Sequence, residues 1–173
     1  DLRLYYGAEY LFNKVNSKGT QTNVDTQEKV SAASRYPDGA TWQTFAGYIN
    51  GEYGLKPNFT LLSGLRYSQV WVDAQFDDTF FPFPFTEADI ITGALTGRLG
   101  VSWFPSANLQ LTLNGSTGFR APNIDDVGKV FDSEPGSVVV PNPDLEPEYA
   151  YNVDFGIRKN FEDKLVLKAS TYY

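Results

Sequence analysis

Apolar and polar residues alternate along much of the chain, with the two-residue period of a strand that has two different faces. Between residues 92 and 103, for example, Leu95, Leu99, Val101 and Trp103 share one parity, and polar or small residues fill the other. The same period recurs in seven segments. We therefore predict seven strands, at about 2–12, 43–55, 58–71, 90–104, 107–120, 148–160 and 164–173.

These strands are long, and their connections follow a rule. Ordinary strands have about 5 to 6 residues, whereas a strand that crosses a membrane at a tilt needs about 9 to 11. Short turns rich in Pro, Asn, Asp and Ser alternate strictly with long connections. The long ones, which we expect on the external side, are 13–42, 72–89 and 121–147. Strict alternation places every long loop on one side of the sheet, as in outer-membrane barrels.

Aromatic residues gather at both ends of the predicted strands, where the two interfaces of a membrane would lie. Beside the short turns are Phe59, Trp103, Phe104 and Phe161. Beside the long loops are Trp42, Phe45, Tyr67, Trp71, Phe119, Tyr149 and Tyr151. The predicted fold class is all-β, an antiparallel up-and-down segment of a transmembrane β-barrel, with residues 1–173 as one partial barrel domain. Single-chain bacterial barrels have even strand numbers, so seven strands and the cut appearance of both termini predict part of a larger barrel.

Composition narrows the function. With 14 basic and 21 acidic residues the net charge is −7, and no basic face is present, which argues against nucleic acid as a partner. The chain has no cysteine and no histidine, so the commonest general base and the commonest metal ligands are missing. We expect no enzyme, no catalytic residue, no metal site and no cofactor. No apolar run approaches the length of a membrane-spanning helix.

Two sequence boxes carry a resemblance to a known family. Residues 118–123 read Gly-Phe-Arg-Ala-Pro-Asn at the end of a predicted strand, and residues 142–148 read Asn-Pro-Asp-Leu-Glu-Pro-Glu before the next. The pair resembles boxes in the barrel of TonB-dependent outer-membrane receptors. Residues 64–67, Gly-Leu-Arg-Tyr, are similar to a recurring strand end of that family, although this shorter motif is less specific.

The resemblance implies a barrel of about 22 strands closed by an N-terminal plug, of which this chain would form roughly a third. It implies a receptor in the bacterial outer membrane that binds a scarce nutrient and imports it with energy from the TonB complex. The expected partners are the rest of the barrel, the plug, outer-membrane lipid and the TonB complex, through a box that this sequence does not contain.

The nutrient itself stays open. Haem receptors of this family place a histidine between the two boxes, and imidazole is a normal ligand of haem iron. Residues 123–141 contain neither histidine nor tyrosine. The expected ligand is therefore an iron–siderophore complex or a similar chelate rather than haem.

Candidate ligand-binding residues follow from position and exposure. Arg120 has the parity of the predicted lumen face and would pair with Asp154 or Glu148, or would contact an anionic ligand or the plug. Four phenylalanines in the second long loop would either pack against a neighbouring loop or the plug, or line a ligand vestibule: Phe80, Phe81, Phe83 and Phe85. A short helix over 123–131, capped by Asn123, is also expected.

Two other classes of protein share some of these features. A soluble β-sandwich of lectin or adhesin type would also alternate, but it would bury its apolar faces against a second sheet. An enzyme housed in an outer-membrane barrel would need a nucleophile with a base, and histidine is absent.

Overall fold

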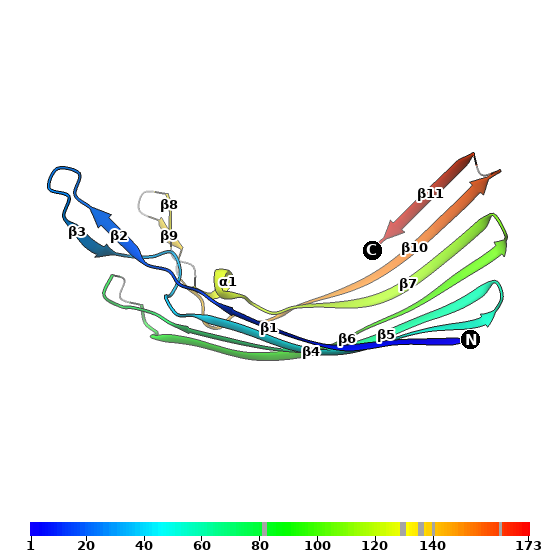
Figure 1. Cartoon of the computed structure of the whole chain (residues 1–173), viewed down its shortest axis with the longest axis horizontal. Coiled ribbons are helices and arrows are strands. Elements are labelled where there is room, and N and C mark those ends of the chain that lie inside the picture. Colours follow the sequence, from blue (N-terminus) through cyan, green and yellow to red (C-terminus); the bar gives the residue numbers. More distant parts are fainter. Residues whose placement is uncertain (81–82, 129–130, 135–136, 140, 163) are drawn as a thin grey trace.

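One curved antiparallel sheet dominates the structure, a computed structural model that describes residues 1–80, 83–128, 131–134, 137–139, 141–162 and 164–173. Seven strands form it in the order β1-β4-β5-β6-β7-β10-β11. Their bounds are β1 Leu2–Lys14, β4 Thr41–Lys56, β5 Phe59–Gln75, β6 Glu87–Ser106, β7 Leu109–Arg120, β10 Glu148–Phe161 and β11 Leu165–Tyr172. Each main strand pairs with the next along the chain, so the predicted up-and-down topology is confirmed (Figure 1).

The sheet has two chemically different faces. Large apolar side chains project from the convex face into the surroundings: on β6, Ile91 and Leu95 are each 66% exposed and Leu99 is 60% exposed. The concave face carries mostly small and polar residues, and a short helix, α1 (Ile124–Gly128), lies against it (Figure 1). A continuous exposed apolar face of this kind needs an apolar environment to cover it.

This arrangement differs from a sandwich. The remaining two sheets that the described residues form have two strands each, β2 (Gly19–Thr22) with β3 (Lys29–Ala32) and β8 (Phe131–Glu134) with β9 (Ser137–Val139). Both hairpins belong to the long loops and leave the convex face uncovered (Figure 1). Within the described residues, β1 and β11 each pair along one side only.

The strands run further into the long loops than the alternation indicated. β5 and β6 stay in register as far as Gln75 and Glu87, well beyond the predicted ends at 71 and 90. Beyond residue 71 the alternation inverts: Val72, Ala74, Ala88 and Ile90 are buried on the concave face, whereas Asp73 and Asp89 are exposed on the other face. The ladder therefore continues, but with the opposite face apolar. Two of the long loops contain secondary structure of their own: the first contains the β2-β3 hairpin, and the third contains α1 and the β8-β9 hairpin.

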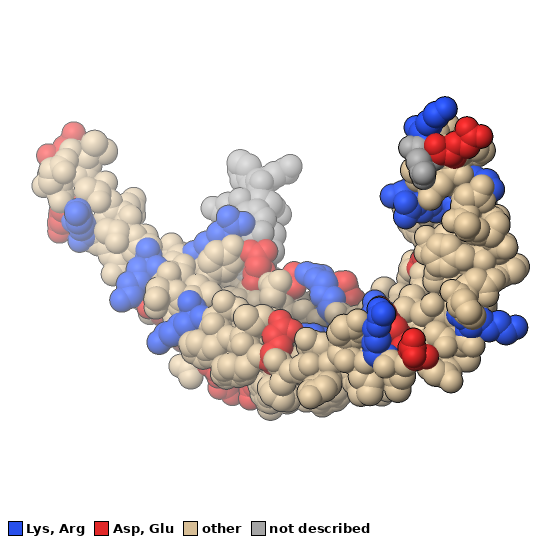
Figure 2. All heavy atoms as spheres, turned by 45° about the vertical axis from the view of Figure 1, so that its right-hand side comes forward, with Lys and Arg blue, Asp and Glu red and all other residues tan. Residues whose placement is uncertain are grey.

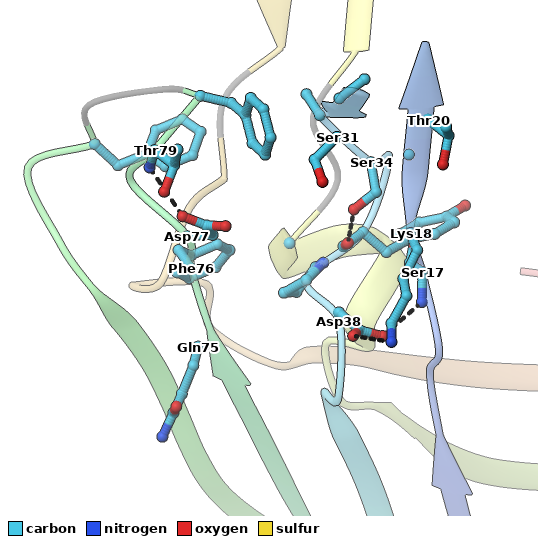
Figure 3. A pocket seen from close by; sticks show the side chains of 18 residues that line it. Ser17, Lys18, Thr20, Ser31, Ser34, Asp38, Gln75, Phe76, Asp77 and Thr79 are labelled. Atoms are coloured by element: carbon cyan, nitrogen blue, oxygen red, sulfur yellow. Dashed lines mark hydrogen bonds and ion pairs between the residues drawn. The ribbon is translucent and has the colours of Figure 1, made fainter. Parts of the chain in front are cut away.

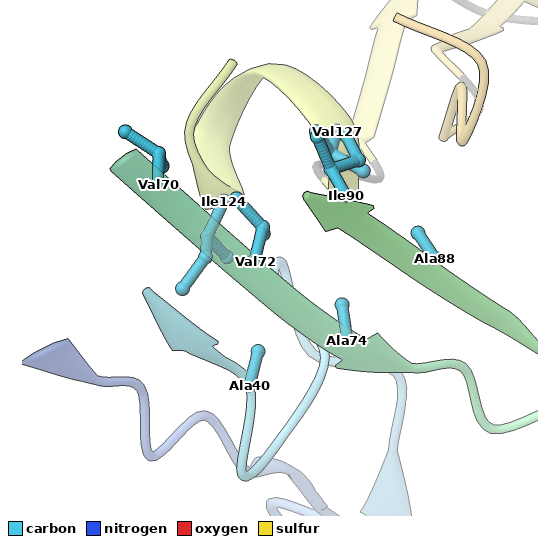
Figure 4. Packing of buried hydrophobic residues seen from close by; sticks show 8 residues of the cluster. All are labelled: Ala40, Val70, Val72, Ala74, Ala88, Ile90, Ile124 and Val127. Atoms are coloured by element: carbon cyan, nitrogen blue, oxygen red, sulfur yellow. The ribbon is translucent and has the colours of Figure 1, made fainter. Parts of the chain in front are cut away.

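A small apolar core lies on the concave face under α1 (Figure 4). Ile124 and Val127 of the helix pack on side chains of β5 and β6, and Val72 and Val127 are fully buried. The sheet side of this core consists of Ala40, Val70, Val72, Ala74, Ala88 and Ile90. The start of the third long loop, as far as Gly128, therefore folds inward over the sheet.

One aromatic residue lies on a different face from its neighbours. Trp42 pairs with Asn13 and Val72, and it packs against the concave core. It therefore does not belong to the membrane-facing band in which the sequence placed it. Its parity is that of Thr44 and Ala46, both of which are buried, and parity decides the face of a strand residue.

No helix in the described part of the chain is long and apolar enough to cross a membrane.

Candidate functional site

The loop ends of the sheet enclose a hollow of about 640 Å³. Two long connections form its opposite walls, the one between β1 and β4 and the one between β5 and β6, and Gly128 of α1 reaches its edge (Figure 3). One wall is aromatic and the other is polar. We call this space the loop hollow.

The aromatic wall is a packed cluster of phenylalanines. Phe76 meets Phe83 and Phe85 edge-on, with ring centroids 6.0 and 5.2 Å apart, and Phe83 stacks on Phe85 at 5.6 Å. Phe76, Phe80 and Phe83 line the loop hollow, whereas Phe85 supports the cluster from behind. Of the four phenylalanines named from the sequence, Phe80 and Phe83 line the loop hollow, and a role for them in ligand binding stays a prediction. Phe81 lies outside the described residues.

Hydroxyl groups dominate the opposite wall. It includes Ser17, Thr20, Ser31 and Ser34. The Ser34 hydroxyl donates to the Tyr36 carbonyl at 2.8 Å. Asp38 accepts from the Ser17 backbone N–H at 2.9 Å, and its carboxylate lies 3.9 Å from the Lys18 ammonium. Because Lys18 and Asp38 neutralise each other, this wall offers hydrogen bonds without a strong net charge.

Asp77 lies beside the aromatic wall of the loop hollow, and its side chain is hydrogen-bonded within its own turn. Its carboxylate accepts a hydrogen bond from the backbone N–H of Thr79 at 2.9 Å. Hydrogen bonds from Thr79, through its side chain and its backbone, lower the pKa of Asp77 from its usual value. The residue is therefore charged at neutral pH and shapes the turn that presents Phe80.

Helix α1 joins the two walls at their base. A side chain at Gly128 would place its Cβ 2.9 Å from Pro37 Cδ and 3.6 Å from Phe76, so only glycine allows this close approach. The Tyr36 hydroxyl donates to Asp125 Oδ1 at 2.6 Å. This hydrogen bond is the main reason that the pKa of Tyr36 is raised, and burial adds to it. Residues from three loops thus meet beneath the loop hollow.

Arg120 fastens the same helix to the two sequence boxes. Its guanidinium donates to both oxygens of Asp126, at 2.8 and 2.7 Å, and to Glu148 Oε1 at 3.2 Å. Pairing with Glu148 was one of the two expected possibilities. The other partner, Asp154, instead accepts from Asn114 at 2.9 Å. Arg120 does not line the loop hollow but a separate hollow of about 260 Å³ between the two boxes. Its contact with an anionic ligand or the plug stays a prediction.

The helix predicted over 123–131 is confirmed at Ile124–Gly128, and residues 129 and 130 lie outside the described part of the chain. Asn123 Oδ1 accepts from the Asp126 backbone N–H at 3.0 Å, and Asp126 Oδ2 accepts from the Asn123 N–H at 3.1 Å. This reciprocal cap satisfies two donors at the helix start. At the other end, the Asn142 N–H donates to the Val127 carbonyl at 3.0 Å, which ties the second box to the helix.

Comparison with known proteins identifies the family. The family model for the "TonB dependent receptor-like, beta-barrel" matches residues 1–173. The chain belongs to the TonB-dependent receptor family. Members of this family are outer-membrane transporters and not enzymes. No curated protein is similar enough in sequence to count as a match.

Solved receptors share the fold of this TonB-dependent receptor chain. The hemophore receptor HasR of Serratia marcescens, in complex with its hemophore HasA and heme, has a TM-score of 0.76 at 18% identity over 99% of this chain and 29% of its own. The copper transporter OprC has a TM-score of 0.80 at 18% identity, over 99% of this chain and 26% of its own. The siderophore receptor PiuA of Acinetobacter baumannii has a TM-score of 0.73 at 16% identity, over 99% of this chain and 28% of its own. The chain thus spans less than a third of each receptor, and at these identities the likeness shows the fold alone.

Several residues around the loop hollow of this receptor chain escaped the sequence analysis. Phe76 was missed because it directly follows a strand, outside the Phe-Pro run. Ser17, Lys18 and Asp38 are too common in loops to stand out. The pairing of Asp126 with Arg120 was also missed, because it depends on the inward fold at the start of the third long loop. No group of three or more acidic side chains that could hold a metal ion occurs among the described residues.

Proposed function

We propose that this chain is part of an outer-membrane receptor that binds a metal chelate, an iron–siderophore complex or a similar one, and imports it with TonB-coupled energy. The loop hollow carries the proposal. It lies at the loop ends of a sheet whose convex face suits lipid, and it combines an aromatic wall with a wall of hydroxyl groups. Ligand pockets are commonly apolar with a few placed polar groups, and a chelate presents both kinds of surface.

The chemistry of the hollow favours a ligand that arrives with its metal already enclosed. The described residues offer no cluster of metal ligands, which argues against capture of a free metal ion. The sequence has no histidine, which argues against axial ligation of haem by imidazole. Rings of Phe76, Phe80 and Phe83 would cover apolar or aromatic parts of a chelate, and the serines would bond its oxygens.

The proposed partners follow from what the sheet leaves unfinished. Within the described residues, β1 and β11 each pair along one side only. Each unpaired backbone N–H or C=O group at an open edge in lipid costs several kcal/mol. The remaining strands of the barrel would close both edges. A plug in the lumen, the TonB complex and outer-membrane lipid complete the proposed set.

An uptake assay tests the proposal. The full-length receptor is expressed in a bacterial strain that lacks its own siderophore and haem receptors, and radioactive iron uptake is measured from a ferric catecholate, a ferric hydroxamate and haem. We expect uptake of a ferric siderophore and a loss of about tenfold or more for Phe76→Ala, because truncation of a packed aromatic anchor typically costs about 2 kcal/mol or more.

A matched control is Phe45→Ala, which removes an exposed aromatic ring from the convex face, 45% exposed, far from the hollow. Phe45→Ala should leave iron uptake unchanged. Uptake of haem alone would contradict the chelate assignment, and a water-soluble, detergent-independent protein would contradict the receptor assignment as a whole.

A further inference from the structure

The three long connections carry most of the acidic residues of the chain. Residues 13–42, 72–89 and 121–147 hold 14 of the 21 acidic residues but only five of the 14 basic ones. Together they therefore carry more negative charge than the whole chain, whose net charge is −7. Figure 2 shows acidic side chains at the outer tip of this end of the molecule, at the left, with basic ones nearby. Surroundings of this kind attract cations and repel anions that approach the loops.

The same imbalance recurs inside the loop hollow. Among the described residues that line it, Lys18, Asp38 and Asp77 are charged. The charged groups of Lys18 and Asp38 lie 3.9 Å apart on the hydroxyl wall. Asp77 is exposed, and no basic side chain comes within 4.0 Å of its carboxylate among the described residues. One negative charge is therefore left in excess, and it lies beside the aromatic wall (Figure 3).

The surroundings of Asp77 suit a cationic group on the ligand. The next residue along the chain on one side, Phe76, packs edge-on against Phe83 and Phe85, and the faces of aromatic rings attract cations. A carboxylate forms charge-assisted hydrogen bonds with an ammonium group. An ammonium group between the Asp77 carboxylate and the rings would gain both interactions, whereas an anionic group at the same place would be repelled by the carboxylate.

We propose that Asp77 makes the loop hollow select ferric chelates by charge, favouring those that carry a pendant ammonium group and disfavouring polyanions. The inference rests on the proposed function and names the class of chelate. Catecholate is a doubly charged ligand, so a ferric tris-catecholate remains a polyanion. Hydroxamate is singly charged, so a ferric trihydroxamate is neutral, and a pendant ammonium group makes it a cation. The hollow therefore fits the trihydroxamate class.

Equilibrium titrations of the detergent-purified full-length receptor test this selection, with quenching of the intrinsic fluorescence as the signal. The probes are ferrioxamine B, which is a ferric trihydroxamate with a pendant ammonium group, its N-acetylated neutral form, and ferric enterobactin, a ferric tris-catecholate. We expect the cationic chelate to bind about three- to fivefold more tightly than its acetylated form, and the tris-catecholate to bind most weakly. The preference should shrink at high salt, because salt screens exposed charges.

The substitution Asp77→Asn separates charge selection from a structural role. Asparagine keeps a side-chain oxygen that can accept from the Thr79 N–H, so the turn beside Phe80 is retained. We expect the affinity for the cationic chelate to fall by about three- to fivefold, the usual effect of losing a partly exposed ion pair. The affinity for the neutral form should stay unchanged, and that for the tris-catecholate should rise. An equal change for all three chelates would mean that Asp77 only shapes the turn, and would overturn the proposal.

The matched control is Asp73→Asn, which removes the same charge from the opposite face of β5. Asp73 is exposed and does not line the loop hollow, whereas its neighbours Val72 and Ala74 are buried on the concave face. The control should bind all three chelates as the unchanged receptor does, and an equal effect of both substitutions would contradict the role of Asp77. Equal affinity of the unchanged receptor for all three chelates would refute the charge selection alone. Binding of none of them would contradict the proposed function as well.

Discussion

Gly128 is the residue on which the base of the loop hollow depends most directly. Its Cα faces Pro37, whose ring cannot swing aside as a flexible side chain can, and an added Cβ would lie 2.9 and 3.0 Å from two ring carbons. We predict that Gly128→Ala pushes the first loop away from α1 and weakens chelate binding, because overpacking typically costs about 1–3 kcal/mol. Equilibrium binding measures this.

Gly118→Ala is the control for that substitution. Its Cβ would meet Ala150 Cβ at 3.6 Å, an ordinary contact, so binding should stay within about twofold if only the close approach at Gly128 matters. An equal loss of chelate binding in the two variants would contradict the prediction that the close approach at Gly128 matters.

Tyr36 gives a prediction about pH. Its neutral hydroxyl donates to Asp125, and this bond raises the pKa of Tyr36 in the folded protein. A raised folded pKa means that the stabilising contact is fully present below the unfolded value of about 10 and is lost as pH rises through the folded value. Spectrophotometric pH titrations of the receptor and of Tyr36→Phe should therefore differ by one tyrosine, whose ionisation lies above the usual pH range. Ionisation at or below pH 10 would contradict it.

At the level of elements, α1 links the boxes to the loop hollow. Val127 is fully buried and packs on β5 and β6. We predict that Val127→Ala destabilises the docked helix by about 1.5–2 kcal/mol, the value of two buried methyl-sized groups. Hydrogen exchange of the Asp126 and Val127 amides, which both donate to Asn123, should then accelerate by about tenfold, with strand amides unaffected. Faster exchange across the whole sheet would mean that the helix supports the barrel and not only the loop.

The helix also shows how much of an element can be read in advance. Asn123, followed by two acidic residues, was enough to predict a helix start, because the cap is a local interaction. The close approach of Gly128 to Pro37 and Phe76 was not predictable, because both residues are distant from it in sequence. In the same way Arg120 could be given Glu148, its partner across the ladder, but not Asp126, whose position requires the inward fold of the loop.

For the whole molecule, the two faces of the sheet lead to opposite predictions. Leu95 points outward and is 66% exposed, whereas Thr92 has the opposite parity and belongs to the concave face. A charge facing lipid near the bilayer centre costs about 2–4 kcal/mol, and a charge facing a polar lumen costs little. We predict that Leu95→Arg sharply lowers the fraction of full-length receptor that folds into lipid vesicles, while Thr92→Arg does not. Equal folding of both variants would contradict the assignment of the convex face to lipid.

The sequence by itself determined the seven strands of the main sheet, their order and, with exceptions such as Trp42, the face on which their residues lie. These depend on a period of two and on turn residues, and both act between near neighbours in the chain. It also supplied the boxes that indicated the family. Only the tertiary structure decided that the start of the third loop folds inward, that Phe76 joins the aromatic wall opposite Ser17 and Ser34, and that Asp77 lines the same hollow. The reason is that these contacts join segments tens of residues apart, whose approach depends on sheet curvature and loop packing, which local alternation does not encode.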